Sequence, residues 1–257
     1  MFLNEFQNVR INDSWTRPSA GRLHARIAGI AAYCIVGYID DWLSLKGAIV
    51  LLSGGIDSAT AMYWALQQTR NIYSMNIEYA QASYQEVSAA KSLATAAKVR
   101  EHLTISLPFF RDIQDRYRPK HSSSVTTAYV PARNTIFYGI AAAYAETLEV
   151  DTVVFGSNAD DTRELPDATP DFIQRMNDLL KIGTRTGADG MSIWIINPLI
   201  NHSKVEVLKL ALELEVPLDI TWSCYEDVQL PCGKCRGCRN RLNAFKQIGM
   251  NDPLKYQ

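Results

Sequence analysis

Short apolar runs alternate with amphipathic stretches between residues 48 and 214 of this chain. The apolar runs predict buried strands at Ala48–Leu52, Ile72–Tyr79, Leu103–Leu107, Asp151–Phe155 and Met191–Ile196. Apolar residues at helical spacing predict helices at Ala59–Gln68, Tyr84–Lys98, Ile136–Leu148, Asp171–Lys181 and Ser203–Leu214. Such alternation favours an α/β fold with a mostly parallel sheet and helices on both faces. In these folds ligands bind beyond the carboxyl ends of the strands.

The pattern divides the chain into three parts. Residues 1–45 form an N-terminal extension, in which apolar residues at roughly helical spacing from Arg22 to Leu45 predict one or two helices. Residues 46–218 carry the strand–helix alternation. Residues 219–257 form a C-terminal region that we expect to pack on the same domain. The simplest role for the extension is to cover the edge of the main domain, and a dimer face, a lid or a docking segment are also open.

The composition is that of an ordinary globular protein, with 47% hydrophobic and 21% charged residues and a formal net charge of -1. This charge balance gives no general attraction to nucleic acid or to an anionic membrane. The longest apolar stretch, Ile27–Ile39, is too short to span a bilayer. Residues Met1–Trp15 lack the basic and apolar segments of a signal peptide. We therefore expect a cytoplasmic protein without membrane contact.

A loop with two glycines joins the first predicted strand to the first predicted helix. Its residues are Ser53, Gly54, Gly55, Ile56, Asp57 and Ser58. The glycines allow unusual backbone angles and close approach of a ligand, and amides at a helix start attract phosphate. Asp57 would repel a bare phosphate but can hold a Mg²⁺ ion that bridges phosphate oxygens. The loop is not a Walker A motif, because no Gly-Lys-Ser/Thr follows. The alternative is a simple turn between strand and helix.

Four of the five cysteines crowd together as Cys224, Cys232, Cys235 and Cys238. Four thiolates on short loops can surround one tetrahedral Zn²⁺, and all four positions would be filled by protein, as in structural zinc sites. An iron–sulfur cluster is the main alternative, because a C-x2-C-x2-C spacing also occurs in ferredoxin-type runs. The remaining alternative is that the four cysteines are free thiols that share no metal.

The loop sequence SGGIDS resembles the pyrophosphate loop of the PP-loop ATP pyrophosphatases. This resemblance implies a Rossmann-like fold of the adenine nucleotide alpha hydrolase type. It also implies transfer of AMP from ATP to a substrate oxygen, followed by displacement of AMP by a nucleophile. An enzyme of this kind must position the reactants and neutralise charge on the phosphates.

Several further motifs, in order, make the chain similar to the QueC family of PP-loop enzymes. They are Leu51–Thr60, Tyr129–Phe137, Pro198–Ile200 with Lys204, Thr221–Tyr225, the cysteine run with Arg241 and Phe245, and Asp252–Pro253 with Tyr256. The resemblance implies a zinc-bearing, often dimeric ATP-dependent ligase. Such enzymes join ammonia to 7-carboxy-7-deazaguanine, giving an amide and, with a second ATP, a nitrile. It places Asp57, Arg133 and Lys204 at the catalytic centre, where the two cations can neutralise phosphate.

Two departures from the family pattern lie near the expected substrate. The Arg and His that usually follow the second strand are replaced within residues 79–83, and the Tyr, Cys and Arg of a later motif are lost within residues 165–170. Asn158, Asp161 and Asp167 are retained, and we predict that they bind the substrate, since carboxylates and amides often bind purine-like edges. For Asp167 the alternative is a helix cap before Phe172.

Four hypotheses follow from these observations. The leading one is a QueC-type ligase. The second is a specialised relative that joins a deazaguanine carboxylate to another amine, for example one on a partner protein in a defence system; the changed motifs and the extension motivate it. The third is a PP-loop enzyme that modifies tRNA, which the near-neutral charge disfavours. The last is a zinc-ribbon binding module with an inactive nucleotide fold, which the joint presence of Ser53, Asp57, Arg133 and Lys204 argues against.

Overall fold

The computed structural model describes residues 45–79, 83–117 and 129–257, which all belong to one compact unit. The predicted helices between residues 22 and 44 lie outside the described residues, as does most of the first altered motif, residues 80–82. The division into residues 1–45, 46–218 and 219–257 therefore stays a prediction.

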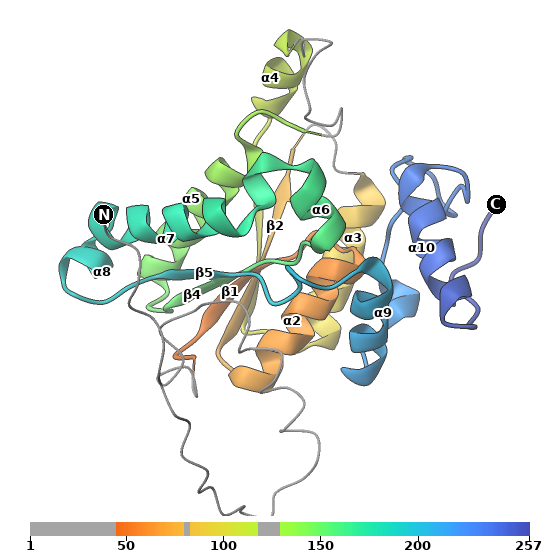
Figure 1. Ribbon diagram of the computed structural model, residues 1–257, viewed down its shortest axis with the longest axis horizontal. Coiled ribbons are helices and arrows are strands. Elements are labelled where there is room, and N and C mark those ends of the chain that lie inside the picture. Colours follow the sequence, from red (N-terminus) through yellow and green to blue (C-terminus); the bar gives the residue numbers. More distant parts are fainter. Residues whose placement is uncertain (1–44, 80–82, 118–128) are drawn as a thin grey trace, which may run out of the picture. The chain divides into compact units, whose positions relative to one another are not determined.

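A five-stranded sheet forms the centre of this unit (Figure 1). The strands are β1 (Ala48–Leu51), β2 (Ile72–Glu78), β3 (Glu101–Ser106), β4 (Thr152–Val154) and β5 (Trp194–Ile196). Their order is β3-β2-β1-β4-β5, and every neighbouring pair is parallel. The predicted α/β fold with a parallel sheet is confirmed. The fifth strand begins at Trp194 rather than Met191, after a short connection that makes no ladder pairing.

Helices follow the strands in the predicted alternation. The longer ones are α2 (Ile56–Gln68), α3 (Tyr84–Ala96), α5 (Arg133–Thr147), α7 (Pro170–Gly183), α9 (Lys204–Glu213) and α10 (Arg236–Gln247). The shorter ones are α4 (Phe110–Arg116), α6 (Ala159–Glu164), α8 (Arg185–Ala188) and the 3-10 turns η1 (Pro166–Ala168) and η2 (Leu218–Ile220). Among the described residues, none of these helices has the length and apolar character needed to cross a membrane.

Two hydrophobic cores lie on opposite faces of the sheet. Successive residues of β1 point to opposite faces, so Ala48 and Val50 belong to one core and Ile49 to the other. The first core is covered by α2, α3, α9 and α10, and the second by α5 and α7 (Figure 1). The near-continuous apolar character of β1 and β4 follows from burial on both faces.

The strand order creates a switch point between β1 and β4. From β1 the chain builds outward through β2 and β3, then returns to the other side of β1 to build β4 and β5. The connections after β1 and after β4 therefore leave the sheet in opposite directions. Such a switch point opens a crevice at the carboxyl ends of the strands, where ligands bind in open α/β sheets.

A buried ion pair anchors the end of the chain. Arg241 in α10 donates from Nε and Nη2 to both carboxylate oxygens of Asp252, at 2.7 and 2.9 Å, and both side chains are almost fully buried. The same guanidinium donates to the Thr221 hydroxyl and the Leu218 carbonyl, and the Tyr256 hydroxyl donates to Asp252. This network fixes α10 to the segment before the cysteines and to the C-terminus.

Candidate functional site

The glycine loop after β1 is shaped by Gly54. Its φ is +93°, and a side-chain Cβ there would lie 2.4 Å from the Glu86 carbonyl oxygen of α3. Only glycine fits this combination of backbone angle and close approach. Gly55 caps α2 with a φ of -81°, so the expectation of an unusual backbone angle holds for Gly54 and is wrong for Gly55. The loop is thus held against the first turn of α3, where burial raises the pKa of Glu86 to about 7.

Two hydroxyls tie the loop to the start of α2. The Ser53 and Ser58 Oγ atoms lie 3.0 Å apart, and Ser58 Oγ accepts from the Ser53 amide and donates to the Gly55 carbonyl. Ser58 is buried, whereas Ser53 is exposed. Ile56 is buried in the first core and fixes the first turn of the helix. This leaves the exposed Ser53 at the loop surface, at the positive end of the α2 dipole, where an anion is favoured.

Asp57 lies at the meeting point of three connections. Its Oδ1 accepts from Lys204 Nζ at 2.6 Å and its Oδ2 accepts from Asn158 Nδ2 at 3.1 Å. Asp57 comes from the first turn of α2 after β1, Asn158 from the N-cap of α6 after β4, and Lys204 from the first turn of α9 after β5. The Asp57 and Lys204 side chains are 18% and 25% exposed, so the pair is partly accessible to a ligand. Asn158 and Lys204 thus contact Asp57 at the switch point, although they lie 101 and 147 positions away from it in the sequence.

Asn158 is held in place by its own helix. Its Oδ1 accepts from the Asp160 and Asp161 amides, and its own amide donates to Asp161 Oδ2, a reciprocal capping box at the start of α6. Burial and the nearby Asp57 charge raise the pKa of Asp161, while hydrogen bonding from the Asn158 amide opposes this. A Cβ on Gly156 would lie 2.4 Å from the Asp57 carbonyl oxygen, so this glycine permits the close approach of the two loops.

Arg133, at the start of α5, belongs to a second group of residues, which also contains Tyr79, Asn134 and Asp167. Its Nη1 donates to the Tyr79 hydroxyl at 3.1 Å, and its Nε donates to the Asn134 side chain at 3.2 Å. Its guanidinium carbon lies 5.7 Å from the Tyr79 ring centroid and 6.0 Å from that of Phe137. These aromatic rings support the cation.

Asp167 belongs to the same second group. Its Oδ2 accepts from the Asn134 amide and its carbonyl accepts from the Asn134 side chain. The interpretation of Asp167 as the cap before Phe172 is wrong, because Thr169 Oγ1 accepts from the Phe172 amide. Asp167 Oδ1 and the Tyr138 hydroxyl are buried without a protein partner. Burial, followed by the charge of Asp167, raises the pKa of Tyr138.

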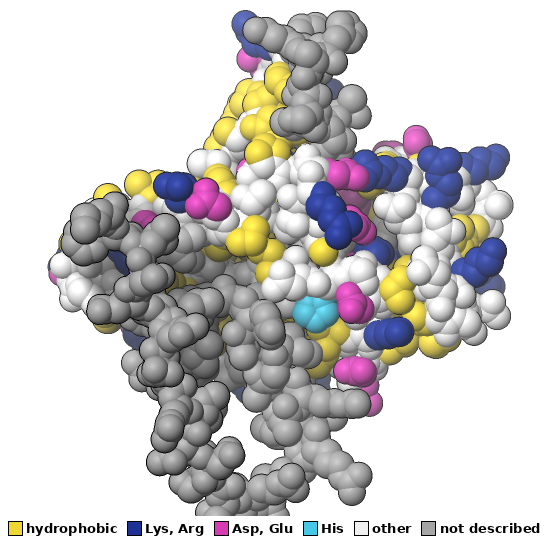
Figure 2. All heavy atoms as spheres, in the orientation of Figure 1, with side chains coloured by type: hydrophobic (Ala, Val, Ile, Leu, Met, Phe, Trp, Pro, Cys, Tyr) yellow, Lys and Arg dark blue, Asp and Glu magenta, His cyan; other side chains and the backbone are white. Residues whose placement is uncertain are grey.

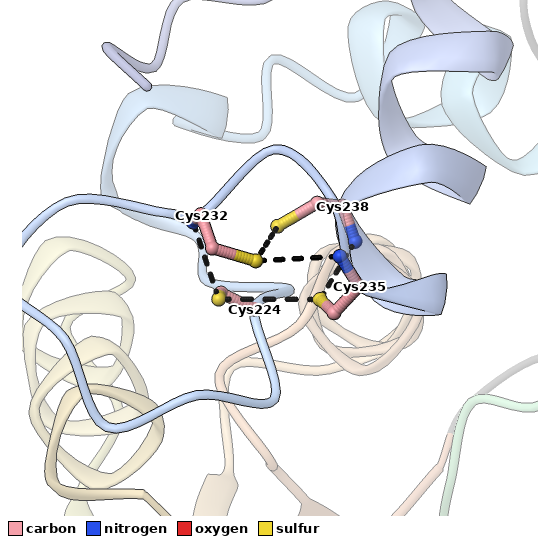
Figure 3. A group of neighbouring side chains, drawn as sticks. All are labelled: Cys224, Cys232, Cys235 and Cys238. Atoms are coloured by element: carbon pink, nitrogen blue, oxygen red, sulfur yellow. Dashed lines mark hydrogen bonds between the residues drawn. The ribbon is translucent and has the colours of Figure 1, made fainter. Parts of the chain in front are cut away.

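The four cysteines converge on one point (Figure 3). Their Sγ atoms all lie within 4.8 Å of one another, and the Cys232–Cys238 and Cys224–Cys235 pairs are 4.0 Å apart. Four sulfurs on a tetrahedral zinc with bonds of about 2.3 Å would be separated by about 3.8 Å. The residues therefore fit a metal ion held by four thiolates.

Backbone amides surround this sulfur cluster. Amides of Lys234 and Cys235 donate to Cys232 Sγ, and they lower the pKa of that thiol to about 6. Burial raises the pKa of Cys224 and of Cys238, because the charged thiolate is disfavoured away from water. Gly233 has a φ of +68°, and a Cβ on Gly237 would lie 2.0 Å from the Ser223 carbonyl oxygen. These two glycines permit the tight turns of the cluster.

The cysteine region contacts the phosphate loop directly. The Trp222 amide donates to the Gly54 carbonyl at 2.8 Å, and Trp222 Nε1 donates to the Cys224 carbonyl. Arg236, which follows Cys235, pairs with Glu164 at the end of α6. Sequence reasoning missed these contacts, because nothing in the residue pattern relates residues so far apart.

Residues 47–249 match the family model described as queuosine biosynthesis protein QueC. The chain belongs to the QueC family. A 7-cyano-7-deazaguanine synthase from Thermosynechococcus vestitus is 40% identical over 231 residues, covering 83% of this chain and 97% of that protein. One from Acaryochloris marina is 39% identical over 224 residues, covering 81% of this chain and 98% of that protein. Because these QueC relatives are named as synthases, the prediction of an enzyme is confirmed at the level of the family.

Solved structures give the same fold for this QueC chain. The NMN synthetase of Francisella tularensis matches with a TM-score of 0.50 at 18% identity, covering 88% of this chain and 85% of that one. At this identity the match shows the fold alone. The predicted Rossmann-like fold and the four-cysteine region near the C-terminus are thereby confirmed. The roles of the individual site residues stay predictions.

Proposed function

We propose that this chain is a 7-cyano-7-deazaguanine synthase that adenylates the carboxylate of 7-carboxy-7-deazaguanine and joins it to ammonia. The observation that carries the proposal is Asp57, held between Lys204 and Asn158 at the end of the phosphate loop. A partly accessible carboxylate beside a lysine suits a site for ATP and a divalent cation. The family match and the identity to named synthases support the substrate.

The reaction begins at the phosphate loop. The amides and hydroxyls of Ser53, Gly54, Gly55, Ile56 and Ser58 are in our proposal the phosphate-binding groups. A substrate carboxylate oxygen attacks the α-phosphorus of ATP, the bond to the β-phosphate breaks, and pyrophosphate leaves. Asp57 would hold a Mg²⁺ ion, which would supply positive charge to the phosphate oxygens. Lys204 and Arg133 stabilise the negative charge that develops, and they act from fixed positions.

Ammonia then displaces AMP. Its nitrogen attacks the carbonyl carbon, a C–N bond forms, and the C–O bond to AMP breaks. In a second round the amide oxygen attacks the α-phosphorus of a second ATP and pyrophosphate leaves. The C–O bond then breaks, AMP departs with that oxygen, and loss of the two N–H protons leaves the nitrile. Separating activation from displacement is useful because AMP is a far better leaving group than an oxide.

Asn158, Asp161 and Asp167 are the proposed substrate-binding residues. The support for Asp167 is its unpartnered, buried Oδ1, close to a Tyr138 hydroxyl that also lacks a protein partner. An unpartnered acceptor and an unpartnered donor suit the alternating donors and acceptors of a guanine-like edge. Buried polar atoms without a partner are rare in native proteins, so a ligand or water is expected there.

Replacing Asp167 by Asn is expected to raise the KM for the deazaguanine carboxylate by about tenfold or more, because a charged hydrogen bond contributes roughly 1.5–3 kcal/mol. The KM for ATP should change little. Steady-state kinetics with each substrate varied in turn measures both values. Asp171→Asn is the matched control. Asp171 is 75% exposed, and among the described residues its side chain forms an ion pair with the exposed Arg175. Equal effects of both variants would remove Asp167 from the substrate site.

We propose that the four-cysteine site holds structural zinc. Metal analysis of the purified protein should give about one zinc per chain and no stoichiometric iron. Cys235→Ser should lose the zinc while keeping the cap of α10, because Cys235 Sγ accepts from the Cys238 amide and a serine hydroxyl can replace it. Lys234→Ala, at an exposed neighbour, should keep the zinc. Iron with sulfide in the purified protein would support the iron–sulfur alternative instead.

The direct test is a product assay. The protein is incubated with ATP, Mg²⁺, 7-carboxy-7-deazaguanine and ammonium, and products are identified by mass spectrometry while pyrophosphate is followed. Amide or nitrile product supports the proposal. Pyrophosphate release without either product would favour the specialised relative that uses another amine, and a search for a mass increase on co-expressed proteins would follow.

From the family resemblance we also propose that the protein is a cytoplasmic homodimer. Light scattering in solution tests the dimer.

A further inference from the structure

Contacts on both sides of the phosphate loop connect it to the cysteine region and to α6. On one side the Gly54 carbonyl accepts from the Trp222 amide, and Trp222 leads into the cysteine region. On the other side Asp57 accepts from Asn158, which starts α6. The two sides meet where α6 ends and α10 begins. There Arg236 Nη2 donates to both carboxylate oxygens of Glu164, at 2.5 and 2.6 Å.

Helix α6 has no buried residue of its own. Most helices in proteins are stabilised by packing an apolar face on the core, and α6 lacks such a face. Its position is set by polar contacts at its ends. At its start the Ala159 amide donates to the His202 carbonyl and Asn158 contacts Asp57. At its end the Arg236–Glu164 pair joins it to the cysteine region.

The surroundings of this pair are strongly charged. Figure 2 shows acidic and basic side chains gathered over the region of α6 and the start of α10. Arg236 and Glu164 belong to this charged surface, and each is partly exposed.

We propose that Arg236 and Glu164 are positioning residues, whose ion pair holds α6 so that Asn158 and Asp57 keep the geometry that binds MgATP. The inference rests on the proposed function, because it assigns ATP to the phosphate loop. The pair itself is not placed in contact with the nucleotide. Its side chains are 48% and 39% exposed, so salt should weaken the pair.

The test compares nucleotide affinity in single and double variants. Glu164→Gln and Arg236→Gln are expected to raise the Kd of a non-hydrolysable MgATP analogue up to about fivefold, the range of a partly exposed ion pair. The variant that combines Glu164→Arg with Arg236→Glu should recover most of the affinity. Raising the salt concentration should weaken binding more for the unmodified protein than for either single variant. In turnover the KM for ATP should rise more than kcat falls.

A matched control lies on the same helix. Arg163 and Asp160 form an ion pair on α6 whose side chains are 78% and 58% exposed, and it joins no other element. Arg163→Gln should leave the Kd unchanged. Zinc content must also be unchanged in all variants, because loss of zinc in Arg236→Gln would mean that the cysteine site, and not the ion pair, carries the effect.

The outcomes separate this inference from the proposed function. Unchanged affinity in both single variants, or no recovery in the exchanged pair, overturns the positioning role. If the unmodified protein binds no MgATP analogue, both this inference and the proposed function fail. If it binds the analogue with the expected dependence on the pair but makes no deazaguanine product, only the proposed substrate fails.

Discussion

Replacing Asp57 by Asn is expected to lower the rate of pyrophosphate release by about 10²–10³-fold, the usual effect of removing one group that stabilises a charged transition state. The change keeps the shape of the side chain but removes its charge. Its Oδ1 accepts from Lys204 at 2.6 Å, and an amide there would lose the ion pair and the site for a divalent cation. Pyrophosphate release with saturating ATP and substrate is the measurement.

Asp160→Asn provides the control for this prediction. Asp160 is a neighbouring carboxylate with a 58% exposed side chain, and it pairs with Arg163 on the surface of α6. Its replacement should leave the rate within about twofold, because exposed ion pairs contribute little. If Asp57→Asn retained the rate of the unmodified protein, Asp57 would have no part in binding the cation or the phosphates.

Replacing Arg241 by Met is expected to lower the free energy of unfolding by about 3–5 kcal/mol, because it leaves the Asp252 carboxylate buried without its partner. The two side chains are 1% and 2% exposed. The variant also removes the donors to the Thr221 hydroxyl and the Leu218 carbonyl, at 2.6 and 2.8 Å. Unfolding by guanidinium chloride, monitored by far-ultraviolet circular dichroism, measures the change.

Two further variants show whether the effect comes from the unpaired charge. Arg239→Met, at an exposed position of the same helix, should change the free energy of unfolding by less than about 0.5 kcal/mol. Combining Arg241→Met with Asp252→Leu should recover part of the loss, since neither charge is then left buried alone. A double variant as unstable as the sum of two severe single variants would argue against this explanation.

The sequence predicted the fold well because burial leaves a simple signal. Strands buried on both faces, such as β1 and β4, are largely apolar, and the helices between them show apolar residues at regular spacing. The cysteine cluster could also be predicted, since the four cysteines that meet in space lie close together in the sequence. The ends of the helices were predicted less accurately than the helices themselves, because caps such as Thr169 depend on single hydrogen bonds.

Contacts between distant residues were the part that the sequence did not reveal. The meeting of Asp57 with Asn158 and Lys204 follows from the strand order, which no local pattern determines. Helix α6 was missed because it has no buried face and hence no apolar period. The Arg236–Glu164 pair joins residues 72 positions apart and carries no local signal either. The family resemblance placed Asp57 and Lys204 at one catalytic centre, and the structure adds the direct contact between their side chains.

The central claim is that this chain activates a carboxylate by adenylation at the phosphate loop. Its most direct test uses 7-carboxy-7-deazaguanine whose carboxylate oxygens carry a heavy isotope, with ATP, Mg²⁺ and ammonium. The account predicts AMP with one heavy oxygen in its phosphate, because the C–O bond of the adenylate breaks when ammonia attacks. Labelled AMP together with amide or nitrile would establish the reaction. Product formed with unlabelled AMP, or with ADP and phosphate in place of AMP and pyrophosphate, would contradict it.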